Sequence, residues 1–153
     1  MKTLQSELLP GRARMRGMSL IELMTVVAIV AILGSLAVGA YGRYSQRANR
    51  TDGTSTLLRI QVAEEKFFLS NNTYTVDFIT APPAGLGILG SATTANGRYT
   101  ITLAAGNSGS IATSFVATAT AYGGQTQDDP ACQVFSINEQ MQRLPLDSTG
   151  CWK

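Results

Sequence analysis

The sequence GMSLIELMTVVAIVAILGSLAVGAYG, residues 17–42, decides the fold of this chain. From Met18 to Gly42 it contains a single charged side chain, Glu22. As a helix rising about 1.5 Å per residue, this segment is long enough to cross the roughly 30 Å hydrocarbon core of a bilayer. A charge costs on the order of 2.5–3.5 kcal/mol at the centre of such a helix, and somewhat less near its end. We therefore expect Glu22 to need a cationic partner.

The segment before the apolar stretch is basic. It carries one acidic residue, Glu7, against Lys2, Arg12, Arg14 and Arg16. This balance is typical of the cytoplasmic end of an export signal. Cleavage after Ala40, at a small-x-small site, is the alternative for an ordinary secretory signal. It is disfavoured because the apolar stretch exceeds the usual length of about 7–15 residues and contains Glu22.

Residues 17–24, GMSLIELM, followed by VVAI at 26–29, closely resemble the processing site of type IV prepilins. The resemblance continues through Ala40, Tyr41 and Tyr44 and, more loosely, to the C-terminal cysteines, so it covers nearly the whole chain. It implies that a prepilin peptidase and N-methyltransferase cuts after Gly17 and methylates the new amine of Met18. It also implies three parts: a leader at 1–17, a transmembrane and assembly helix at 18–42, and a head domain at 43–153.

The resemblance gives Glu22 a partner. A subunit entering a helical bundle brings a terminal ammonium at Met18, and the Glu22 carboxylate of a neighbour can neutralise it. Burying either charge alone would cost several kcal/mol, so the pair selects axial register more than it adds stability. The alternative is a plain single-pass anchor whose carboxylate reaches the membrane interface, and the glycine and its spacing disfavour it.

Three positions depart from the family pattern. Met18 stands where phenylalanine is usual, Ala31 where glycine is common, and Gly39 where a kinking proline is normal. Proline removes a helix hydrogen bond, whereas glycine only loosens the helix by about 1 kcal/mol. We expect a softer bend near Gly39 than a proline would give.

The resemblance and the residue patterns together predict an α+β type IV pilin fold. The helix is expected to continue to about Leu69, with a bend or break at 51–54, where poor helix formers cluster. Two apolar arcs imply two packing partners, one of them a sheet. One arc holds Leu57, Ile60, Ala63, Phe67 and Phe68, and the other holds Leu58, Val62 and Leu69. A surface connection at 71–97 should precede an antiparallel sheet with strands at 99–103, 114–122, 133–137 and 141–144.

Cys132 and Cys151 are the only cysteines, and the chain is expected to be exported. A disulfide is therefore favoured over two free thiols, and it would bound a C-terminal loop. Closing a loop of about 20 residues contributes on the order of 3 kcal/mol by restricting the unfolded chain. We expect no metal and no cofactor, since the chain lacks histidine. A calcium site at Asp128, Asp129 and Asp147 is the weaker alternative, because ordered ligand spacing is missing.

Charge argues against a general nucleic-acid surface. Without the leader, the chain holds eight basic and nine acidic residues. The basic run Arg43, Arg47 and Arg50 is best explained by contact with lipid headgroups. The remaining candidates for a DNA patch on the head, Arg98, Arg143 and Lys153, are too few to predict one. An enzyme is also disfavoured, because neither a nucleophile-base arrangement nor a phosphate-binding glycine motif is visible.

We predict a non-enzymatic structural subunit of a type IV pilus, most similar to a minor pilin of a Gram-negative cell. The resemblance implies roles in pilus assembly, twitching motility and surface attachment. It also implies an inner-membrane protein with a cytoplasmic N-terminus that later enters an extracellular pilus. Its partners would be other pilin subunits and the prepilin peptidase. The alternatives are a type II secretion pseudopilin, a major pilin, and a pilus-borne DNA-binding or uptake pilin.

Overall fold

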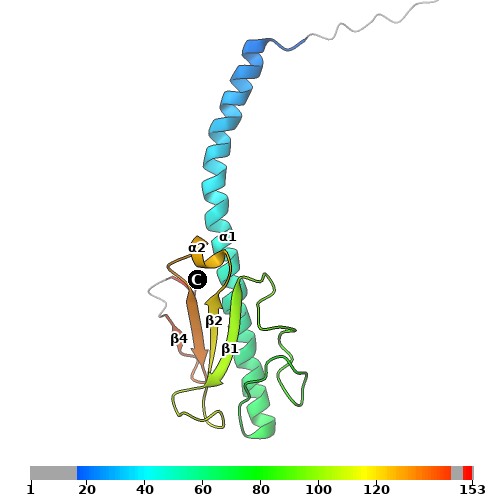
Figure 1. Ribbon diagram of the computed structural model, residues 1–153, viewed down its shortest axis with the longest axis vertical. Coiled ribbons are helices and arrows are strands. Elements are labelled where there is room, and N and C mark those ends of the chain that lie inside the picture. The colour runs from blue at the N-terminus through cyan, green and yellow to red at the C-terminus, as the bar shows by residue number, and fades with distance from the viewer. Residues whose placement is uncertain (1–16, 146–149, 153) are drawn as a thin grey trace, which may run out of the picture. The chain divides into compact units, whose positions relative to one another are not determined.

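The computed structural model describes residues 17–145 and 150–152. They form a long helix, four strands and one short helix (Figure 1). The elements are α1 (Leu20–Asn71), β1 (Tyr99–Ala105), β2 (Phe115–Ala121), α2 (Gln125–Asp128), β3 (Val134–Asn138) and β4 (Arg143–Leu144). The chain divides into two compact units between Gly39 and Ala40, inside α1, and each unit is described by itself below.

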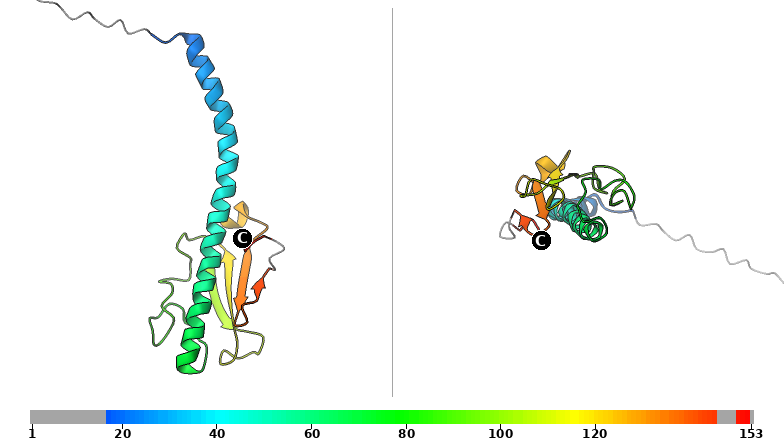
Figure 2. Two further views of the ribbon diagram at one scale, coloured as in Figure 1. Left: turned by 180° about the vertical axis from the view of Figure 1, so that it is seen from behind. Right: turned by 90° about the horizontal axis from the view of Figure 1, so that it is seen from below.

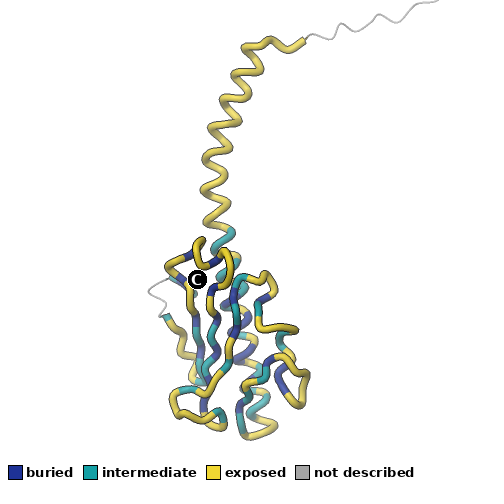
Figure 3. Tube along the Cα trace, in the orientation of Figure 1, coloured by how far each residue is buried: buried dark blue, intermediate teal, exposed yellow. Residues whose placement is uncertain are grey.

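The first unit contains the N-terminal part of α1. Every described residue of this unit is exposed, including 13 large apolar side chains from Met18 to Val38, as the yellow tube in Figure 3 shows. The helix has a mean hydropathy of 2.4 over its most apolar window, which is also completely exposed. It is long and apolar enough to cross a membrane, as the sequence predicts.

In the second unit, α1 continues without a break to Asn71, so the break considered at 51–54 is wrong. The hydroxyls of Thr51 and Thr54 donate to carbonyl groups one turn earlier in the helix. Gly53 is buried against the Tyr99 ring, and a Cβ at that position would lie 3.2 Å from it. The poor helix formers therefore serve close packing of the helix on the sheet.

The four strands form one antiparallel sheet in the order β1-β2-β3-β4. All four lie within two residues of the predicted ranges at each end. The register pairs Tyr99 with Ala121 and Ala117 with Ile137. The glycine-rich segment at 106–109 turns the chain between β1 and β2, and Gly109 adopts φ +77°, which glycine tolerates best.

The sheet packs along one side of α1 in the second unit (Figure 2). Leu57 and Ile60 of the first apolar arc are completely buried. They belong to a core that also contains the inward side chains of the sheet, which are Tyr99, Ile101, Phe115, Ala117, Ala119, Phe135 and Ile137. Ala63, Phe67 and Phe68 of the same arc are partly buried against this core. The predicted packing of this arc on a sheet is confirmed.

The connection between α1 and β1 covers one end of the core and does not lie only on the surface. Tyr74 stacks on Phe68 with ring centroids 4.6 Å apart and meets Phe115 edge-on at 4.9 Å. Phe78 and Leu86 from the same connection are also buried. The sequence did not predict this contribution, because turn formers dominate the segment.

The predicted disulfide joins Cys132 to Cys151, with Cα atoms 5.5 Å apart. Both residues are buried, and the bond closes the C-terminal loop around β3 and β4. Trp152, next to the bond, contacts the Phe135 ring edge-on at 5.9 Å.

Candidate functional site

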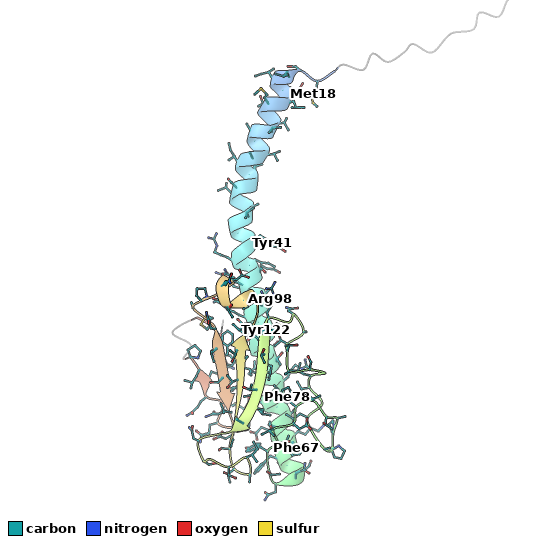
Figure 4. The ribbon with its side chains drawn as sticks, viewed as in Figure 1. Met18, Tyr41, Phe67, Phe78, Arg98 and Tyr122 are labelled. Carbon is teal, nitrogen blue, oxygen red and sulfur yellow. A yellow bond between two sulfur atoms is a disulfide. The ribbon has the colours of Figure 1, made fainter. Side chains whose placement is uncertain are left out.

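The residues predicted to act in processing and assembly lie together at the start of α1. Gly17 and Met18 precede the helix, and Glu22 lies in its first turn. The Ser19 carbonyl accepts hydrogen bonds from the backbone N–H groups of Glu22 and Leu23, each at 3.1 Å. These bonds fix the first turn, and Figure 4 labels Met18 at this end of the helix. A carboxylate in the first turn is favourable, because the helix dipole is positive there.

The surroundings of Glu22 are apolar and open. Its neighbours Leu20, Ile21 and Leu23 are all more than half exposed, and among the described residues none forms an ion pair with Glu22. Any cation that pairs with Glu22 therefore lies outside the described residues of this chain. Glu22 can accept hydrogen bonds from an ammonium group, which is the chemistry that a processed N-terminus supplies.

The basic run after the apolar helix divides into two kinds of residue. Arg43 and Arg47 are exposed, as expected for contact with headgroups. Arg50 instead forms a bidentate ion pair with Asp129, with its Nη2 2.6 Å from Oδ1 and its Nε bonded to Oδ2. The hydrogen bond to Asp129 is the main cause that raises the pKa of Arg50. Only two of the three arginines are thus available to a lipid surface.

The Arg50–Asp129 pair belongs to a polar cluster that attaches α2 to α1. Asn49 donates to the side-chain oxygen of Gln125 at 2.9 Å, and Gln125 donates to the Tyr99 hydroxyl at 3.1 Å. The Tyr99 hydroxyl donates to the Cys132 carbonyl at 3.3 Å, and burial raises the pKa of Tyr99 to about 12. The cluster therefore connects the disulfide loop to the long helix. The sequence did not predict this cluster, because the residues of α1 lie 76 or more positions before their partners in and next to α2.

The candidate calcium ligands do not form a site in the described part of the chain. Asp129 is occupied by Arg50 and is 2% exposed, whereas Asp128 is exposed. Asp147 lies outside the described residues. Among the residues that the structure describes, no group of three or more acidic, cysteine or histidine side chains is arranged to hold a metal ion.

The candidate DNA-contacting residues are separated. Arg98 precedes β1 at one edge of the sheet, whereas Arg143 begins β4 at the other edge. The Arg143 guanidinium lies 5.3 Å from the centroid of the Trp152 ring, a cation–π contact. Lys153 lies outside the described residues. The structure therefore does not bring Arg98 and Arg143 into one basic patch.

A buried carboxyl group lies on α1 beside the connection to β1. Glu64 is completely buried, and its Oε2 accepts a hydrogen bond from the Thr75 N–H at 3.1 Å. Its Oε1 has no hydrogen-bond partner among the described residues. Burial raises the pKa of Glu64 to about 7, the Thr75 hydrogen bond opposes this change, and the charge of Glu65 adds to it. Ionised Glu64 therefore destabilises the head.

Glu64 predicts a pH dependence of stability. Because folding raises the pKa of Glu64, the unfolded chain loses this proton at a lower pH than the folded chain does. The free energy of unfolding should therefore fall as pH rises from about 4.5 to about 7. Glu64→Gln keeps an acceptor for Thr75 and removes the charge, so we expect it to be more stable than the wild type at pH 8 by about 1–3 kcal/mol. The two proteins should differ far less at pH 4.5.

Thermal unfolding of the detergent-solubilised chain at both pH values measures this difference. The neighbouring Glu65→Gln variant is the control, because Glu65 is only half-buried and should leave most of the wild-type pH dependence in place. A Glu64→Gln variant with the same pH dependence as the wild type would show that this carboxyl group does not ionise in the folded head.

Comparisons with known proteins show the family to which the chain is similar. A family model described as "Type IV minor pilin ComP, DNA uptake sequence receptor" matches residues 39–136, and a model of the prokaryotic N-terminal methylation motif matches residues 12–38. A solved type IV pilin from Shewanella oneidensis is similar at 20% identity, with a TM-score of 0.49, over 71% of this chain and 98% of that chain. No curated protein matches the chain.

Proposed function

Because this chain belongs to the type IV minor pilin family, we propose that Glu22 and the processed amine of Met18 fix its register in the pilus. The chain is a structural subunit that is anchored in the membrane and assembles with other pilins into an extracellular pilus. Its methylation motif implies processing by a prepilin peptidase. Within this established role, cleavage after Gly17 would place the new amine four residues before Glu22 in the sequence.

The observation that carries the proposal is the isolation of one carboxylate in an exposed apolar helix. Glu22 is the only charged residue between Met18 and Gly42, and the surrounding helix is unburied in its own chain. When neighbouring helices cover that segment, the carboxylate loses its hydration. That loss costs several kcal/mol if the carboxylate is unpaired, and an ion pair with an ammonium offsets much of this cost. The position of this ion pair along the helix would then set the axial offset between neighbouring subunits. Replacement of Glu22, followed by recovery of sheared filaments, tests the proposal.

A second candidate function is binding of DNA by the head, and the description of the family as a DNA uptake sequence receptor supports it. The Tyr122 N–H donates to the Arg98 carbonyl at 2.8 Å, continuing the β1–β2 pairing in which Tyr99 lies opposite Ala121. Since Tyr99 and Ala121 point into the core, Arg98 and Tyr122 share the outward face of the sheet. Figure 4 labels both near α2. An exposed ring beside a guanidinium suits stacking of a base and contact with a phosphate.

This candidate predicts a measurable loss of affinity. Arg98→Gln should weaken binding of duplex DNA several-fold and lower the slope of log affinity against log salt by about one, because one phosphate contact is lost. Arg143→Gln, at the opposite edge of the sheet, is the matched control and should bind as the wild type does. Filter binding between low and physiological salt gives both quantities. Binding of the wild type without any salt dependence would rule out this function.

A further inference from the structure

A groove runs between α1 and the connection that leads to β1. One wall comes from Leu58, Val62 and Phe67 of α1, and the other from Pro82, Leu86 and Ile88. Its volume is about 630 Å³, and it is lined mainly by apolar atoms. Figure 4 shows Phe67 on the lower part of α1 and Phe78 on the connection beside it. The groove lies wholly within the second unit.

Leu58 and Val62 on the α1 wall belong to the second apolar arc, whereas Phe67 belongs to the first arc and is partly buried against the core. Val62 is 69% exposed, and Leu69, further along the same arc, is 87% exposed. The core packs mainly on the first arc of the same helix, and no described segment covers Val62 and Leu69 to a comparable extent. An uncovered apolar surface of this kind marks an interaction site.

Two cations border the groove and lack acidic partners. Arg59 and Lys66 line it from α1, two helical turns apart, and no acidic residue is among its lining residues. The positions three and four residues from each cation hold only neutral side chains, so no helical ion pair is available. In the described part of the chain, neither residue forms an ion pair, and Arg59 makes one long hydrogen bond to the Ile88 carbonyl at 3.4 Å.

We propose that this groove receives an apolar segment carrying at least one carboxylate from a neighbouring pilin subunit. The apolar lining accounts for the contact area, and Arg59 and Lys66 select a segment with a negative charge. A filament requires such a pairing of two different surfaces, because head-to-tail contacts that do not close into a ring generate open helical assemblies. The proposal rests on membership of a filament and does not depend on the pairing of Glu22.

The experiment places the photo-reactive residue benzoylphenylalanine at position 62 of the full chain in piliated cells. Illumination should give a covalent adduct with a pilin, and mass spectrometry should locate it on a peptide that contains Asp or Glu. The same residue at position 120, on the exposed outer side of β2, is the control position and should give at most a tenth of that adduct. The adduct yield is divided by the amount of the chain in sheared filaments, so that a change in incorporation is not mistaken for a change in groove contact.

Charge reversal tests the selection by the two cations. A chain with Arg59→Glu and Lys66→Glu should lose at least five-fold in adduct yield, whereas Arg98→Glu, outside the groove, should leave the yield unchanged. The proposal is overturned by an adduct with lipid or with a protein that is not a pilin, by the absence of any pilin adduct, or by a yield that the double reversal does not change. A Glu22→Ala chain that enters filaments at the wild-type level and still gives the pilin adduct at position 62 would instead count against the register proposal alone.

Discussion

Replacing Glu22 with alanine is expected to leave the chain in the inner membrane and to reduce its amount in sheared filaments at least ten-fold. Alanine favours the helix and the bilayer, so insertion should be intact or improved. The loss would arise in assembly, because the Met18 ammonium of the incoming or neighbouring subunit would be buried without its counter-charge. Breaking a buried ion pair by removing one partner costs about 3–5 kcal/mol, and each 1.4 kcal/mol corresponds to a factor of ten.

Two variants separate charge from shape in this experiment. Glu22→Gln has nearly the size of the native side chain but lacks the charge, so it should fail as the alanine variant does. Thr25→Ala alters a neighbouring exposed residue whose hydroxyl donates to the Ile21 carbonyl and to no other described residue, and it should assemble normally. Quantitative immunoblotting of the membrane and sheared fractions gives the comparison. Recovery of Glu22→Gln in filaments at the wild-type level would show that the carboxylate does not set the register.

Replacing Gly17 with valine is expected to block removal of the leader completely. The resemblance of residues 17–24 to prepilin processing sites places the cut directly after this glycine, where a branched side chain would obstruct the peptidase. The effect should not come from folding, because a Cβ at position 17 meets no atom of the described chain within 4 Å. The variant should therefore fold but keep all 17 leader residues and migrate more slowly on a gel.

Gly34→Ala is the matched control for the processing variant. Gly34 lies in the same apolar segment, and a Cβ there also meets nothing within 4 Å, so its substitution tests whether any added methyl group in this region disturbs processing. We expect it to be processed as the wild type is. Unchanged mobility of Gly17→Val relative to the wild type would place the cut elsewhere.

The sequence predicted the long helix, the four strands and the disulfide, because each depends on local pattern or on a scarce residue type. The apolar run from Met18 can form little else but a helix in a membrane. Alternating β-branched and aromatic residues define the strands locally. Two cysteines in an exported chain leave one intrachain pairing.

The contacts that the sequence did not predict join residues far apart in the chain. Arg50 bonds to Asp129, 79 positions later, and no feature of the nearby sequence indicates this contact. Its neighbours Arg43 and Arg47 remain exposed and can contact lipid headgroups. Gly53 looks like a helix breaker until the Tyr99 ring is seen to fill the space beside it. Tyr74 similarly enters the core from a segment rich in turn formers. In each case tertiary packing overrides local propensity.

The register account requires a free amine at Met18, and the mass of the mature chain tests this requirement most directly. Intact-mass and N-terminal peptide analysis of the protein purified from sheared filaments should give a chain that begins at Met18 and carries one methyl group on its amine. A chain that begins at Met1 would contradict the account, because its amine would lie 21 residues before Glu22. A chain that begins at Tyr41, after a cut following Ala40, would also contradict it, because Glu22 would have been removed.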